Sequence, residues 1–284
     1  MTDHNGLFPG RYFISTVLDS LEDKTAMSGK VSRIYLMRAA MAGGLAGIMY
    51  LADFAVVAAF SGIGNGELVG VGRMLGALVF GFALVFIYYS KSELLTSNMM
   101  IVAIGAYHRR TTPMKALRIL FLCYVGNFIG GLVVALLLAG STLTEGPING
   151  QMEAAVDHKL AYLSEGFAGY SDLFVRAILC NFMINLAMLM VYNGRIKDDF
   201  TKSLAMIMSV FVFAFLGFEH SVANTVLFTI VGLQHGVDIS LALGNIAIVL
   251  LGNFVGGGLL IGYYYAYAND DRRYLRKQST APSE

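Results

Sequence analysis

Charged residues are scarce in this chain, since Lys, Arg, Asp and Glu together make up only 14% of its 284 residues. A typical soluble domain carries about 25%. Cysteine is scarcer still: Cys123 and Cys180 lack the spacing of a metal site and give no basis for a disulfide framework. The first 34 residues are charged and lack the apolar core of a secretory signal peptide, so we expect no cleaved leader. What remains to be explained is the apolar majority, 56% of the chain.

Six long apolar runs cover residues 35–60, 74–89, 116–140, 173–192, 203–218 and 243–268. A helix that spans a membrane needs about 20 mostly apolar residues, and runs 74–89 and 203–218 are too short. Each stops at a polar segment, SKSELLTSN or EHSVAN, and a short apolar piece, 99–107 or 225–233, then completes one crossing. The sequence therefore predicts an all-α membrane protein with six transmembrane helices, of which the second and fifth are broken near the bilayer centre.

The two halves of the chain repeat one another. Glu93 and Asn98 in SELLTSN correspond to Glu219 and Asn224 in FEHSVAN, and GNFIGG (126–131) corresponds to GNFVGG (252–257). The offsets 219 − 93, 224 − 98 and 253 − 127 all equal 126. Because each half holds three crossings, an odd number, the second half is expected to be inverted relative to the first, which gives an inverted 3+3 repeat. Broken helices at matching positions of inverted repeats predict a transport site at the midplane.

The distribution of Lys and Arg predicts orientation, because cytoplasmic loops carry an excess of these residues. They gather in the N-terminal segment, the second and fourth inter-helix loops and the tail, whereas the other side has only Arg73, Lys159 and the boundary residue Arg176. We expect both termini in the cytoplasm and a multi-pass protein of the inner or plasma membrane. The expected segments are a cytoplasmic N-terminal segment with a short amphipathic helix (1–34), the first repeat (35–140), an extracellular loop (141–172), the second repeat (173–268) and a cytoplasmic tail (269–284).

Polar residues at the two breaks are the candidate functional residues. His220 is the only histidine in a predicted crossing, and it is either a buried neutral side chain or a proton-exchanging group. Glu93 and Glu219 are expected to stabilise the breaks by accepting backbone amides. Lys91 either pairs with a nearby glutamate or faces an aqueous vestibule. The helix restarting after each break has free amides that attract anions without a fixed cation.

Other kinds of chemistry are disfavoured. The glycines of GIGNGELVGVG have no strand before them, so a dinucleotide site is not expected. FEHS has the wrong order for a helical zinc motif, and Asp53 has no second intramembrane aspartate to form a protease dyad. We expect no enzymatic activity, no cofactor or metal, and no nucleic-acid partner.

The chain closely resembles the formate–nitrite transporter family over residues 35–268. Four segments carry the resemblance: SELLTSN, ILCN, GFEHSVAN and GNFVGGGLLIG. The resemblance implies an aquaporin-like fold, a homopentamer with one pore per protomer, and transport of formate, nitrite, hydrosulfide or lactate. It assigns the central pore histidine to His220, the neighbouring asparagine to Asn181 and the threonine of the first break to Thr96. Ser221, Asn98 and Asn224 are further candidates for contact with the substrate.

The resemblance also places apolar constrictions at Phe80, Leu84, Leu94 and Phe213. Members usually have an extracellular lysine about sixteen residues before the LCN asparagine. The nearest candidate here is Lys159, 22 residues before Asn181, and with Lys91 it is a candidate for attracting anions.

These residues lead to a mechanism. A carboxylate entering an apolar constriction costs tens of kcal/mol of desolvation. Protonating an acid with a pKa of ~4 at neutral pH costs only about 4 kcal/mol. The sequence therefore predicts pH-dependent transport of small monovalent weak-acid anions, formate first, as the neutral acid formed near His220. The alternative is an obligate proton-coupled monocarboxylate symporter with discrete conformational states.

Overall fold

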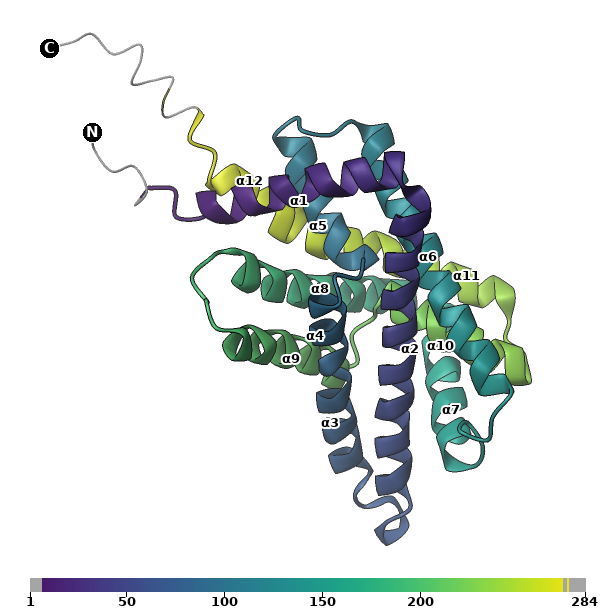
Figure 1. Ribbon diagram of the computed structural model, residues 1–284. Helices are drawn as coiled ribbons and strands as arrows, with labels where there is room; N and C mark the ends of the chain where they lie inside the picture. Colours follow the sequence, from purple (N-terminus) through teal and green to yellow (C-terminus); the bar gives the residue numbers. More distant parts are fainter. Residues whose placement is uncertain (1–6, 273–274, 276–284) are drawn as a thin grey trace, which may run out of the picture.

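The computed structural model describes residues 7–272 and 275, and within them every regular element is helical. In chain order the helices are α1 (Arg11–Lys30), α2 (Ser32–Ser61), η2 (Gly64–Gly66), α3 (Val69–Phe80), α4 (Phe82–Tyr89), α5 (Leu95–Tyr107), α6 (Pro113–Ala139), α7 (Pro147–Ala161), α8 (Gly166–Tyr192), α9 (Asp199–Phe215), α10 (Ser221–His235), α11 (Ile239–Asn253), the π-helical η3 (Phe254–Tyr263) and α12 (Tyr264–Ala268) (Figure 1).

Among the described residues, five helical segments are long and apolar enough to cross a membrane: Ser32–Ser61, Val69–Tyr89, Pro113–Ala139, Gly166–Tyr192 and Ile239–Ala268. The second of these corrects the expectation that run 74–89 is too short, because the helix already begins at Val69 and has 21 residues. Helices α9 and α10 have 17 and 15 residues, so neither is a full span by itself. The chain is thus a multi-pass membrane protein, and its helix lengths alone do not give six spans.

Short non-helical segments separate α4 from α5 and α9 from α10. Helix α4 ends at Tyr89 and α5 begins at Leu95, while α9 ends at Phe215 and α10 begins at Ser221. Each second piece begins four residues earlier than expected, since 99 − 95 and 225 − 221 both equal 4. The earlier start has a physical reason, because the first amide of each helix is bound by an asparagine side chain.

Glycines bring the helices into close contact. A Cβ on Gly43 of α2 would overlap the backbone carbonyl of Asn127 in α6, and one on Gly130 of α6 would overlap the carbonyl of Ala40. In the other half, a Cβ on Gly256 would overlap the carbonyl of Ile178 in α8. The GNFxGG segments therefore pack backbone against backbone, as small residues do between transmembrane helices.

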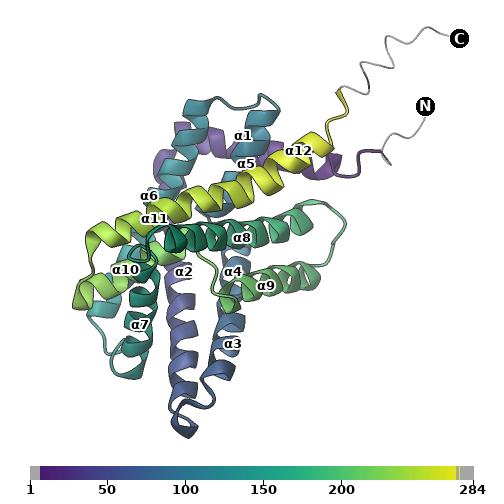
Figure 2. The same cartoon turned by 180° about the vertical axis from the view of Figure 1, so that it is seen from behind.

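The molecule has two opposite faces (Figures 1 and 2). The terminal face carries α1, α12 and the loops 108–112 and 193–198; the α7 face carries α7 and the loops 62–68 and 236–238. On the terminal face Gly10 donates to Asn269 Oδ1 at 2.7 Å, and Tyr107 donates to Asp270 Oδ2 at 3.0 Å. Hydrogen bonds from Arg272 hold the pKa of Asp270 well below its ordinary value. These contacts fasten α1 and the end of α12 to the helix bundle.

Candidate functional site: two helix breaks and a central histidine

Asn127 of α6 organises the first break. Its Nδ2 atom donates to the carbonyls of Ala39 and Glu93, both at 2.8 Å, and its Oδ1 atom accepts from the amide of Leu95 at 3.1 Å. The amide of Glu93 donates to the carbonyl of Arg38 at 3.2 Å. One buried side chain thus satisfies three backbone groups that the interruption leaves without helical partners.

Asn253 of α11 makes the same contacts at the second break. It donates to the carbonyls of Ala177 and Glu219 at 2.8 and 2.9 Å and accepts from the amide of Ser221 at 2.9 Å. The amide of Glu219 lies 3.4 Å from the carbonyl of Arg176. The positions correspond through 253 − 127 = 126 and 177 − 39 = 138, so the repeat in the sequence is a repeat of hydrogen bonds.

The two glutamates have different partners from those expected. Glu93 accepts from Asn98 Nδ2 at 3.1 Å and forms a close ion pair with Lys24 of α1. Glu219 accepts from Asn224 Nδ2 at 2.6 Å, and both its oxygens lie 2.9 Å from Lys159 Nζ. The structure therefore corrects the expectation that these carboxylates accept backbone amides. They hold a lysine and an asparagine side chain, while Asn127 and Asn253 bind the backbone.

His220 joins the two breaks. Its Nδ1 atom accepts from the amides of Val222 and Ala223 at 3.1 and 3.2 Å and so caps α10. Because an accepting Nδ1 carries no proton, the neutral ring carries its proton on Nε2. The Nε2 atom lies 3.2 Å from Thr96 Oγ1, in the first turn of α5. The histidine thus presents an N–H donor beside the hydroxyl of the opposite break.

Cavities approach this pair from both faces. On the α7 face an outer cavity of about 420 Å³ leads to an inner chamber of about 80 Å³ lined by Phe80, Phe213 and His220. On the terminal face a cavity of about 650 Å³, the terminal cavity, is lined by Leu84 and Leu94, among others. The four residues assigned to constrictions therefore divide into an aromatic pair on the chamber side and a leucine pair on the terminal side. The rings of Phe80 and Phe213 meet edge to face with centroids 6.1 Å apart.

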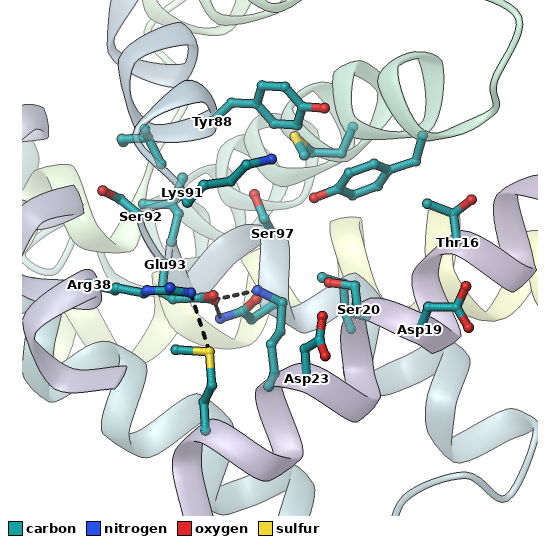
Figure 3. Close-up of a pocket in the computed structure, with 18 of the residues that line it drawn as sticks. Thr16, Asp19, Ser20, Asp23, Arg38, Tyr88, Lys91, Ser92, Glu93 and Ser97 are labelled. Carbon is teal, nitrogen blue, oxygen red and sulfur yellow. Dashed lines mark hydrogen bonds and ion pairs between the residues drawn. The ribbon is translucent and has the colours of Figure 1, made fainter. Parts of the chain in front are cut away.

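The terminal cavity also decides between the two alternatives for Lys91. Figure 3 shows Lys91 at the cavity wall close to Tyr88, while Glu93 binds other groups. The Lys91 ammonium lies 5.4 Å from the centre of the Tyr88 ring, and among the described residues it has no ion pair with a glutamate. Helix α1 contributes Asp19 and Asp23 to the same cavity. Lys91 therefore faces the cavity.

The remaining candidates have mostly supporting positions. Asn181 is fully buried and donates to the carbonyls of Thr96 and Asn253 at 3.1 and 2.7 Å, so it ties the two breaks together. Ser221 Oγ is buried without a hydrogen-bond partner among the described residues. Asn98 and Asn224 are both held by glutamates, although Asn224 also lines the inner chamber.

Sequence reasoning missed four residues of this network: Asn127, Asn253, Asn185 and Lys24. The first two lie in the matched GNFxGG segments, and a buried asparagine repeated at offset 126 was a usable signal. Asn185 donates to the Thr96 carbonyl at 3.1 Å and lies one turn after Asn181. Nothing in the sequence marks Lys24, because its role depends on where α1 docks.

Comparison with known proteins places this arrangement in context. Residues 12–267 match the family described as formate/nitrite transporter. The chain is 31% identical to the formate channel FocA of Haemophilus influenzae over 225 residues, 70% of this chain and 75% of that one. It is 27% identical to the nitrite transporter NirC of Salmonella typhimurium over 269 residues, 89% and 93% of the two chains. A solved structure described as an FNT family ion channel superposes with a TM-score of 0.78 and 26% identity, covering 91% of this chain and 99% of that one.

Proposed function

Because the chain belongs to the formate/nitrite transporter family, we propose that it conducts small monovalent weak-acid anions across a membrane. Formate is the first candidate, followed by nitrite, lactate, acetate and hydrosulfide. Because the members of this family are transporters, the chain is a transport protein and not an enzyme. Its proposed partners are the anion, protons and membrane lipid.

The hydrogen bond between His220 Nε2 and Thr96 Oγ1 is the observation that carries the proposal. His220 lines the inner chamber, and the neighbours of Thr96, Leu94 and Ser97, line the terminal cavity. A path between the two faces therefore passes these two side chains. An anion that displaces this hydrogen bond can accept hydrogen bonds from the Nε2–H group and from the hydroxyl, at the centre of an apolar passage.

Passage as the neutral acid is favoured because protonating the anion costs less free energy than desolvating its charge. The idealised cost of moving a bare carboxylate into an apolar medium is of order 20 kcal/mol, whereas protonating formate at pH 7 costs about 4 kcal/mol. His220 Nδ1 is occupied by two amides, so a second proton on the ring would cost the cap of α10. We therefore assign to His220 a hydrogen bond to the anion, and the proton comes from another group along the passage.

The proposed architecture is a homopentamer with one pore per protomer. A solved structure described as a pentameric formate channel with formate bound has the same fold, with a TM-score of 0.68 and 22% identity over 87% of this chain and 98% of that one. In the proposal α9 and α10 together form the fifth crossing, and α5 extends the second crossing beyond its break. The terminal face is assigned to the cytoplasm.

Purified protein in liposomes tests the function by light-scattering measurement of swelling. At pH 7.5 we expect formate to enter at least about tenfold faster than into protein-free liposomes, and we expect no such acceleration for sulfate. His220→Phe, which removes the N–H donor and the cap, should abolish most of this pH-dependent flux. Equal rates with and without protein for every weak acid would refute the proposal.

Conductance in planar bilayers distinguishes the channel from the symporter. Current through single pores would favour the channel. Saturable flux strictly coupled to one proton per anion, without measurable conductance, would favour the symporter.

A further inference from the structure

Asp53 lies where the outer cavity meets the inner chamber. Both cavities are lined by Tyr50, Asp53, Lys159, Ala214 and Gly217, which we call the neck. Within the described part of the chain, Asp53 is the only carboxylic acid that lines both cavities; Glu219 lines the outer one alone. Every substrate that takes this path passes its carboxyl group.

The Asp53 carboxyl has no structural partner. Among residues 7–272 and 275 this half-buried side chain makes no hydrogen bond and no ion pair, and it is open to both cavities. Lys159, the cation at the neck, already binds both oxygens of Glu219 at 2.9 Å. Helix α3 leaves room for the carboxyl, since a Cβ on Gly76 would overlap Asp53 Oδ1.

The other ionisable groups around the neck come from several elements: Arg73 of α3, His158 and Lys159 of α7, Arg176 of α8, Glu219 before α10, Tyr50 of α2 and His220 in the chamber. Lys159 is neutralised by Glu219, and Arg176 binds Asp172 at 2.9 Å. Arg73 and His158 line the outer cavity but not the chamber. An anion arriving at the neck therefore meets Asp53 without an opposite charge in contact with it.

We infer that Asp53 is the proton-transfer residue of this transporter on the α7 face, an inference that rests on the proposed function. Two carboxylates in one small site cannot both remain ionised, so the pair takes up one proton. The O–H bond of the neutral Asp53 carboxyl breaks as its proton joins a formate oxygen. Formic acid then continues past Phe80, Phe213 and His220, and the Asp53 carboxylate takes a new proton from water in the outer cavity.

Liposomes containing Asp53→Asn test the inference, with the same pH on both sides so that the orientation of the protein has no influence. The amide keeps the shape of the side chain and cannot donate an acidic proton. At pH 7 wild-type protein should carry formate about a hundredfold faster than the variant, which is the lower end of the range for a positioned acid. Near pH 4.5, where bulk formic acid is abundant, the two rates should converge.

Two variants serve as controls. Asp53→Glu keeps the acid and should keep most of the flux at pH 7. Glu67→Gln removes an exposed carboxyl on the same face, outside both cavities, and should behave as wild type. Equal or faster flux through Asp53→Asn at pH 7 would overturn the inference, because a carboxylate that only repels anions gives that result.

A measurement on the unmodified protein covers the case in which Asp53→Asn does not assemble. Dicyclohexylcarbodiimide attacks protonated carboxyls, so at neutral pH it should label Asp53, identified by peptide mass, and block formate flux. An unlabelled Asp53 with flux intact would contradict the inference. The proposed function fails separately, if wild-type protein carries no weak acid at any pH.

Discussion

The two ring nitrogens of His220 serve different parts of the molecule. Nδ1 caps α10, and Nε2 reaches the first turn of α5. At the matching position of the first break, 220 − 126 = 94, stands Leu94, which gives α5 no side-chain cap. The repeat is therefore symmetric in its asparagines and glutamates and asymmetric at its centre, where a single imidazole serves both helices.

His220→Asn separates the cap from the proposed contact with the anion. Asparagine is a strong N-cap, so the variant should keep thermal stability close to wild type, while His220→Ala should lose about 1 kcal/mol. Both variants lack the imidazole N–H and should lose most formate flux. Thermal unfolding in detergent and liposome swelling measure the two effects. An Asn variant with wild-type flux would show that the ring acts only as a cap.

Individual residues were predictable to different degrees. Polar placement within apolar tracts made His220, Glu93 and Glu219 candidates, because such placement is costly without a partner. In the structure all three side chains are buried and hydrogen-bonded. The assignment of backbone amides to the glutamates was wrong, since an amide side chain both donates and accepts and can satisfy three backbone groups at once. Asn127 and Asn253 do this, but their neighbouring glycines directed the interpretation toward helix packing.

Helix α1 shows how an element acquires a role that its own sequence does not reveal. The sequence predicted a short amphipathic helix within residues 1–34; in the structure α1 has 20 residues, from Arg11 to Lys30, and buries Phe13, Val17 and Leu21. This docking places Lys24 on Glu93, so the first break has a lysine partner as the second has Lys159. The partner depends on a tertiary contact that no local pattern encodes.

Lys24→Met tests this connection between α1 and the first break. Removing one partner of a largely buried ion pair leaves Glu93 with Asn98 alone and should cost about 3 kcal/mol, lowering the melting temperature by about 6 °C or more. Adding Glu93→Gln should restore much of the loss, because the uncompensated charge is gone. Lys30→Met, on an exposed position of the same helix, is the control. A loss no greater than that of the control would contradict the pairing.

Another element escaped prediction for a geometric reason. Four of the five glycines of GNFVGGGLLIG lie in a π-helical stretch, Phe254–Tyr263, and Gly252 lies in α11. A Cβ on Gly257 would overlap the side-chain amides of Asn181 and Asn185, which hold the Thr96 carbonyl. The widened helix and the missing side chain together admit these amides. The sequence indicates that small residues are needed here, but not which groups approach them.

For the whole molecule, the strongest prediction from sequence was the repeat. Motifs at a constant offset of 126 correspond to matching hydrogen bonds at both breaks. Span number was harder to predict, because apolar runs do not mark helix ends. Helix α3 begins at Val69, in a segment whose glycines interrupt the apolar run, whereas α9 and α10 stay short. The apolar runs identify the membrane-spanning segments, while turn residues and neighbouring side chains decide where each helix ends.

The orientation of the molecule can be tested with single cysteines. The loop 193–198 on the terminal face carries Arg195 and Lys197, whereas the loop 62–68 on the α7 face has no Lys or Arg. The positive-inside tendency therefore assigns the terminal face to the cytoplasm. In intact cells a membrane-impermeant maleimide should label Glu67→Cys and should label Lys197→Cys only after the cells are opened. Cys123 and Cys180 are fully buried, so wild-type protein gives the background. The reverse labelling pattern would invert the assignment, and with it the direction in which Asp53 would deliver its proton.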